Sequence, residues 1–194
     1  MGIEQLDGSA DLAAAHDALE GHRWQEAFDL LTRTDHNGGL GPSDLEALAQ
    51  AAWFTAQPDL PVEARESAFK AYLAAGNRSR AAKVAFELNR EYDRKQKFSI
   101  ASAWAARGEH VLEGEPQGAA YGYRALSKSL AAERISDVET AIKFAREAME
   151  IGAEFGDADI RAWGLLQQGR LLIAGGRNDE GFSLLEEATI AGVN

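Results

Sequence analysis

Small residues recur along this sequence at nearly constant intervals of 37, 37, 40 and 40 residues. Each is followed, four and seven residues later, by another small or apolar residue. This spacing places small side chains on one face of a helix, where a neighbouring helix can approach the backbone closely. A period near 40 residues therefore predicts an all-α solenoid of stacked helix pairs. The repeated positions are Ala27, Ala64, Ala101, Ala141 and Gly181.

Turn and capping residues divide the 194 residues into five helix pairs. Ser43 and Glu46, and again Ser136 and Glu139, have the spacing of a capping box at the start of a helix. No alternating apolar pattern of useful length indicates a strand. We predict a single right-handed array over residues 1–194, with units at about 9–34, 43–75, 78–112, 117–155 and 158–191.

The last two units resemble tetratricopeptide repeats, because small, turn and apolar residues stand at the offsets typical of that repeat. The aromatic residue expected after the turn between the helices is replaced by Val138 or Asn178, and the spacing exceeds the usual length of about 34 residues. The resemblance implies a tetratricopeptide-like array in which the first helix of each pair lines the concave surface. The matching positions are Ser129, Ser136, Ala141, Ala145 and Ala148 in the fourth unit, and Gly169, Gly176, Gly181, Leu185 and Ala188 in the fifth.

Three segments, residues 80–88, 151–157 and 180–188, resemble the helical-repeat region of actinobacterial LuxR-type transcriptional regulators. The resemblance to that region implies a role in signal reception or protein interaction. In the same family a separate helix-turn-helix domain binds DNA, and this sequence ends before such a domain could begin. The resemblance therefore supplies no catalytic and no DNA-contacting residue.

Composition excludes several classes of function. A net charge of −11 disfavours nucleic acid and anionic membrane surfaces as partners. The chain has no cysteine, and its four histidines lack the spacing of metal ligands, so we predict neither a metal nor another cofactor. No nucleophile, base and orienting group occur in a recognisable order, which argues against an enzyme. Without a signal peptide or an apolar segment of membrane-spanning length, we expect a cytoplasmic protein.

Residues 78–97 form a basic exception, with seven lysines and arginines against three acidic residues. Two interpretations are open. The segment is either a solvated helix face paired with acidic neighbours, or a local patch for an acidic partner.

Large side chains on the predicted first helices provide a candidate groove. Aromatic rings together with arginines suit a protein or peptide partner, or a small apolar or anionic ligand. The alternative is that these large residues form the core between repeats. Counting from the repeated small positions places these residues near the concave surface: Trp53, Phe86, Arg90, Tyr123, Leu130, Trp163 and Arg170.

These patterns favour a non-enzymatic interaction or ligand-sensing domain, as the regulatory part of a bacterial transcriptional regulator. The alternative function is a stand-alone homo-oligomeric scaffold. The last helix carries Phe182, Leu184, Leu185 and Ile190, and only Ala191 to Asn194 follow. Because a terminal repeat must cover its stacking surface, we expect a second copy in a two-fold homodimer, or a following segment, to pack on this unit.

Overall fold

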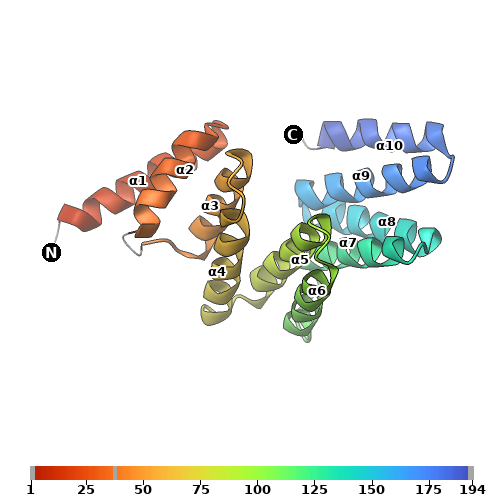
Figure 1. The fold of residues 1–194 in the computed structure, drawn as a ribbon, viewed down its shortest axis with the longest axis horizontal. Helices are drawn as coiled ribbons and strands as arrows, with labels where there is room; N and C mark the ends of the chain where they lie inside the picture. Colours follow the sequence, from red (N-terminus) through yellow and green to blue (C-terminus); the bar gives the residue numbers. More distant parts are fainter. Residues whose placement is uncertain (1–2, 37–38, 192–194) are drawn as a thin grey trace. The chain divides into compact units, whose positions relative to one another are not determined.

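The computed structural model describes residues 3–36 and 39–191, and every regular element in these residues is an α-helix. Successive helices pack as five pairs, which confirms the predicted all-α helical-repeat fold (Figure 1). The first helix begins at residue 3 and not at about residue 9. The helices are α1 (Ile3–Glu20), α2 (Trp24–His36), α3 (Pro42–Phe54), α4 (Leu60–Ala74), α5 (Arg78–Arg94), α6 (Phe98–Leu112), α7 (Ala119–Arg134), α8 (Val138–Phe155), α9 (Ala158–Ala174) and α10 (Asn178–Ala191).

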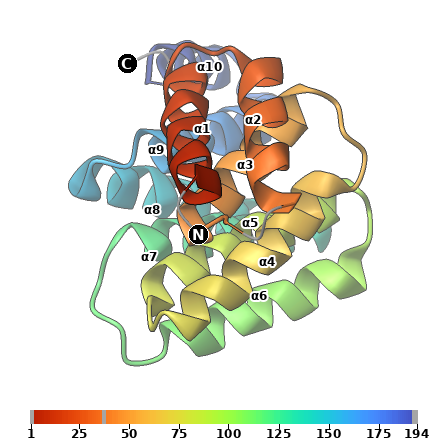
Figure 2. The ribbon, with the colours of Figure 1, turned by 90° about the vertical axis from the view of Figure 1, so that its left-hand side faces the viewer.

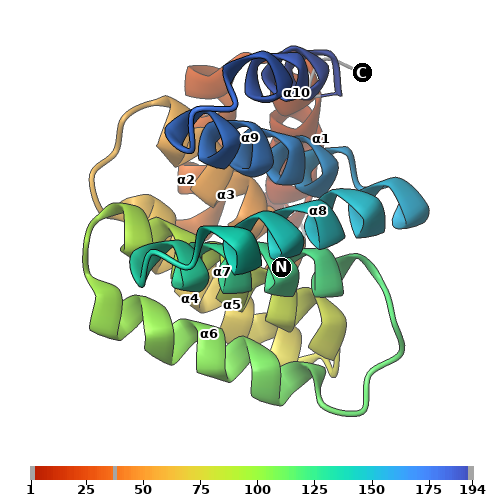
Figure 3. The same ribbon diagram turned by 90° about the vertical axis from the view of Figure 1, so that its right-hand side faces the viewer.

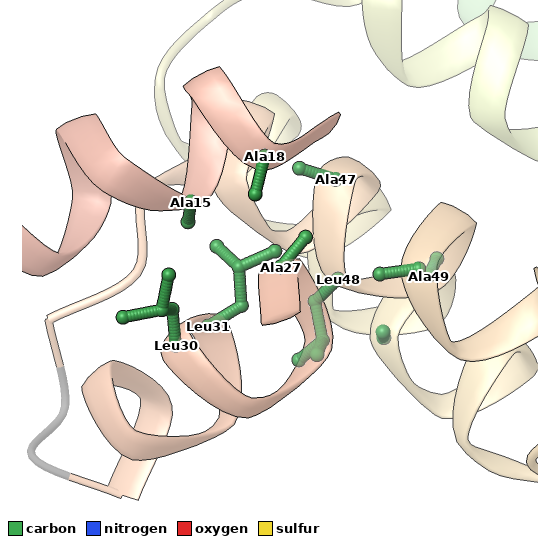
Figure 4. Packing of buried hydrophobic residues seen from close by; sticks show 10 residues of the cluster. Ala15, Ala18, Ala27, Leu30, Leu31, Ala47, Leu48 and Ala49 are labelled. Atoms are coloured by element: carbon green, nitrogen blue, oxygen red, sulfur yellow. The ribbon is translucent and has the colours of Figure 1, made fainter. Parts of the chain in front are cut away.

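Close contacts divide the chain into two compact units, Met1–Asn77 and Arg78–Asn194. The first unit contains α1 to α4, in which each helix packs against the next (Figure 2). Its core is built largely from alanine and leucine, so these helices approach one another closely. The cluster includes Ala15, Ala18, Ala27, Leu30, Leu31, Ala47, Leu48 and Ala49 (Figure 4).

The second unit contains α5 to α10 and positions the candidate site. The first helices of its three pairs follow one another, since α5 packs against α7 and α7 packs against α9 (Figure 3). The second helices are placed differently. α8 and α10 both pack along α9, but within the described residues they do not pack against each other.

The repeated small residues lie at the helix crossings within the pairs. All five are buried, and twelve residues before each stands a second buried residue that is alanine, asparagine, serine or glycine. The Ser129 hydroxyl donates a hydrogen bond to the Ala141 carbonyl at 2.8 Å, and the Asn89 amide donates to the Ala101 carbonyl at 2.9 Å. The pattern therefore marks a contact that recurs in every pair. The buried residues that stand twelve positions apart in each pair are Ala15 and Ala27, Ala52 and Ala64, Asn89 and Ala101, Ser129 and Ala141, and Gly169 and Gly181.

Both predicted capping boxes are displaced from the true helix starts. The box at Ser43 places the start of α3 two residues too late, and the box at Ser136 places the start of α8 one residue too early. α3 is capped at Gly41, whose N–H donates to the Asp44 carboxylate at 3.0 Å, because Pro42 occupies the first helical position. α8 is capped at Asp137, which accepts a hydrogen bond from the Thr140 N–H. Ser136 lies in the preceding turn with a φ of 61°. Each of the five pairs has one such left-handed residue in its turn: His22, Ala56, Gln96, Ser136 and Gly176.

Candidate functional site

The candidate site is a pocket of about 290 Å³ in the second unit, which we call the first-helix pocket because α5, α7 and α9 line it. Leucines and a tryptophan form its apolar part, and three arginines stand among the charged and polar groups. No other element contributes to the lining. The residues are Arg90, Asp93 and Arg94 from α5, Leu126 and Leu130 from α7, and Trp163, Leu166, Gln167 and Arg170 from α9.

The sequence repeat explains why these side chains meet. Arg90, Leu130 and Arg170 stand 40 residues apart, so each occupies the same register of a successive first helix. One helical turn earlier, Leu126 and Leu166 are again 40 residues apart. Side chains four residues apart share a helix face, and stacked repeats align these faces. Two aligned rows of repeat positions therefore supply five of the nine residues that line the first-helix pocket.

A cation–π contact joins the outer two helices of the pocket. The Arg90 guanidinium on α5 lies 4.0 Å from the centre of the Trp163 ring on α9. Trp163 and Leu166 remain 37% and 39% exposed, although both side chains are large and apolar. A guanidinium packed on an aromatic ring keeps its N–H groups suited to bidentate binding of a carboxylate. The contact thus places a cation directly beside an exposed apolar surface.

A second group of charges surrounds Glu133 on α7. Its Oε2 accepts hydrogen bonds from Arg170 at 2.6 Å and from Gln167 at 2.8 Å. Partial burial raises the pKa of Glu133, but these two hydrogen bonds outweigh that effect and hold its pKa below the ordinary value. The carboxylate is therefore ionised at neutral pH and holds Arg170 at the edge of the pocket.

The charges at and around the first-helix pocket are predominantly positive. Asp93 is paired with Arg134 at 2.5 Å, and Glu133 is paired with Arg170. The lining of the pocket itself carries three arginines and one aspartate, in a chain of net charge −11. This region is a local exception to the acidic protein, and it attracts anionic groups.

Four of the seven residues predicted for the groove come together in this pocket: Arg90, Leu130, Trp163 and Arg170. Two others are buried. Phe86 packs against Gly108 of α6, where an added Cβ would lie 2.7 Å from the phenyl ring. The Tyr123 hydroxyl lies 3.4 Å from Asp157 Oδ1, and burial raises the pKa of Tyr123 far above its ordinary value. Both belong to the packing between helices. Trp53 is exposed on α3, in the first unit.

Sequence reasoning missed five residues of the pocket: Asp93, Arg94, Leu126, Leu166 and Gln167. The two leucines could have been found, because they share the repeat register of Phe86, which the sequence analysis included. Arg94 could also have been found, since it follows Arg90 by one helical turn. Asp93 and Gln167 carry no comparable signal.

In the basic segment 78–97, some residues fit the first of its two interpretations and others fit the second. Several of its cations are paired with acidic neighbours, as expected for a solvated face: Arg78 with Glu115 at 3.0 Å, Lys95 with Glu91 at 3.8 Å, and Lys83 with Glu87 at 3.9 Å. Arg90 and Arg94, in the same segment, line the first-helix pocket. The segment thus supplies two of the arginines of the candidate site.

Within residues 3–36 and 39–191, no three histidine, aspartate or glutamate side chains gather closely enough to hold a metal ion. In that part of the chain, no helix combines the length and the apolar character needed to cross a membrane.

Neither a protein-family model nor a curated protein matches this chain. Solved structures do match. BtubC (BKLC) from P. vanneervenii superimposes with a TM-score of 0.58 at 17% identity, covering 92% of this chain and 77% of that one. A putative kinesin light chain from Podosopora anserina, with nearly identical TPR-like repeats, superimposes with a TM-score of 0.55 at 17% identity, covering 95% and 94% of the two chains. A second structure of that protein gives a TM-score of 0.56 at 16% identity, covering 94% of this chain and 93% of that one. These likenesses show a tetratricopeptide-like helical-repeat fold.

Proposed function

We propose that this chain is a non-enzymatic interaction domain that binds a partner polypeptide in the first-helix pocket. The observation that carries the proposal is the pair of exposed apolar side chains, Trp163 and Leu166, beside the arginines of α5 and α9. Interfaces are enriched in tryptophan and arginine, and these residues often dominate binding energy. Tetratricopeptide-like folds generally mediate protein interactions, which agrees with this role.

The chemistry of the pocket specifies the partner segment. Its volume of about 290 Å³ lies just below the usual range for ligand pockets, so it holds one or two side chains. The leucines and Trp163 favour an apolar side chain there. The excess positive charge favours aspartate or glutamate on either side, because arginine binds carboxylates through two parallel hydrogen bonds. The proposed partner is thus a peptide segment with an apolar residue flanked by acidic ones.

Selection of random peptides displayed on phage tests this function. We expect the selected peptides to share a large apolar residue with neighbouring aspartate or glutamate, and to bind more weakly as salt is raised. Peptides without acidic residues, or binding that does not change with salt, would contradict the proposed recognition.

Two finer parts of the proposal rest on the sequence. The resemblance of residues 80–88, 151–157 and 180–188 to LuxR-type regulators supports a regulatory role in transcription, in which the bound partner would bias two arrangements of the repeats. The acidic composition supports a protein that does not itself bind nucleic acid or membranes. The lack of cysteine agrees with a cytoplasmic protein.

The second candidate function is a homo-oligomeric scaffold, and α10 is the observation that favours it. Phe182 and Ile190 on this last helix are 56% and 65% exposed. A second copy of the chain that covered them would form a homodimer through the C-terminal unit. Light scattering at micromolar concentration distinguishes the two candidate functions. A dimer that Phe182→Glu dissociates supports the scaffold, whereas a monomer contradicts the scaffold and favours the peptide-binding domain.

A further inference from the structure

A second pocket, of about 510 Å³, lies in the same unit among α8, α9 and α10. We call it the α9 pocket, since the two flanking helices pack along α9 without packing against each other. Its lining mixes both signs of charge with an amide, a hydroxyl and apolar groups. The residues are Arg146 from α8, Gln168 and Leu172 from α9, Arg177 from the turn, and Asp179, Glu180, Ser183 and Leu184 from α10.

Gln168 distinguishes this pocket from an ordinary surface depression. The side chain is only 8% exposed, and its Oε1 is buried without a hydrogen-bond partner. An amide oxygen that is shielded from water and unpaired is destabilising, so such groups are rare in folded proteins. Leu88 and Lys128 occupy the equivalent positions of the two preceding repeats, which shows that the fold itself does not require an amide there. Rotation about the last side-chain bond lets the amide present either its oxygen or its nitrogen to the pocket.

The charged groups around Gln168 have two different roles. Arg177 donates two hydrogen bonds to the Glu180 carboxylate, so this pair satisfies itself. Arg146 and Asp179 form no ion pair within residues 3–36 and 39–191. The α9 pocket therefore offers one guanidinium, one carboxylate and one buried amide to a ligand, together with the apolar side chains of Leu172 and Leu184.

We infer that the α9 pocket binds a zwitterionic ligand of the amino-acid class that carries an apolar side chain. The ligand carboxylate binds Arg146. The ligand ammonium donates a hydrogen bond to Asp179. It donates a second one to the Gln168 Oε1 once the amide has rotated to turn this oxygen toward the pocket. Its side chain packs on Leu172 and Leu184. A free amino acid and a short peptide share this chemistry, and a pocket of this volume holds either one. The inference concerns a different set of helices from the first-helix pocket and does not depend on its partner.

Calorimetric titration of the full chain with L-leucine and with leucyl-leucine tests the inference and separates the two sources. We expect saturable binding of at least one, and the tighter of the two identifies the natural class. Leucinamide lacks the carboxylate and N-acetyl-leucine lacks the ammonium, so each should bind at least tenfold more weakly than leucine. The inference is overturned if neither zwitterion binds at 10 mM, or if either analogue binds as well as leucine. A dissociation constant of 10 mM corresponds to about 2.7 kcal/mol of binding free energy.

Gln168→Leu provides the sharper test, since leucine already occupies the equivalent buried position at residue 88. Loss of the unpaired amide should leave the thermal midpoint unchanged or raise it by roughly 2–4 °C, while ligand binding is lost. Arg146→Gln should weaken binding about tenfold without altering the midpoint. Arg107→Gln on α6 is the matched control and should bind as the parent does. Retained binding in Gln168→Leu, or a lower midpoint, would show that the amide has a structural role and would overturn the inference.

Discussion

Gly164→Ala should lower the free energy of unfolding by about 2–3 kcal/mol, although the change adds only one methyl group. Gly164 lies where α9 crosses α8, and an added Cβ would stand 2.5 Å from the Met149 backbone nitrogen and 2.8 Å from the Ala145 carbonyl oxygen. Backbone atoms cannot rotate aside, so the two helices must separate. Alanine favours helix over glycine by about 1 kcal/mol, and the steric cost exceeds this gain. Urea denaturation followed by circular dichroism measures the difference.

Gly175→Ala is the matched control for this change. An added Cβ there would lie 3.5 Å from its nearest neighbours, the Leu171 and Leu172 carbonyl oxygens, which is ordinary van der Waals contact. Its φ of −84° suits any residue. We expect stability to stay the same or to rise by up to about 1 kcal/mol. Equal stability of the Gly164 variant and the parent would mean that α8 and α9 do not pack this closely.

Trp163→Ala should weaken binding of a selected acidic peptide by roughly 30-fold or more, which corresponds to about 2 kcal/mol. The substitution removes the largest apolar surface of the first-helix pocket and also the ring on which Arg90 packs. Because the side chain is already 37% exposed, the helices should remain folded. Fluorescence polarisation of the labelled peptide measures affinity, and thermal unfolding of the same sample checks the fold.

Phe155→Ala tests whether any exposed aromatic ring would give the same result. Phe155 is 40% exposed at the end of α8, and it does not line the first-helix pocket. Its removal should change peptide affinity less than twofold. The pocket assignment fails if both variants lose affinity equally, or if Trp163→Ala binds as the parent does.

The helical-repeat fold could be predicted from the sequence because one physical requirement recurs in every pair. Where the two helices cross, neither can carry a large side chain, so a small residue stands at Ala141 and another at Ser129. The ends of helices depend on local detail that repeats less faithfully. Pro42 moves the start of α3 to an earlier residue, and the left-handed turn at Ser136 delays the start of α8. Serine spacing alone does not reveal either effect.

The first-helix pocket could be predicted only in part, because register determines which face a residue occupies but not what packs against it. Arg90, Leu130 and Arg170 share a register and meet as expected. Phe86 shares the register of Leu126 and Leu166, yet it does not line the pocket, since Gly108 on α6 leaves room for its ring. The space for the Phe86 ring is provided by a glycine on a different helix. The periodicity of the helix that carries Phe86 cannot show this space.

Charge reversal at Arg90 tests most directly the claim that the first-helix pocket binds an acidic partner. The Arg90 guanidinium lies 4.0 Å from the centre of the Trp163 ring, and that of Arg107 on α6 lies 4.5 Å from the centre of the Trp104 ring. Both arginines thus pack on a tryptophan, but only Arg90 lines the pocket. We predict that Arg90→Glu weakens binding of the selected acidic peptide at least tenfold at low salt, and that Arg107→Glu changes it less than twofold. Equal affinities for the two variants would contradict the account.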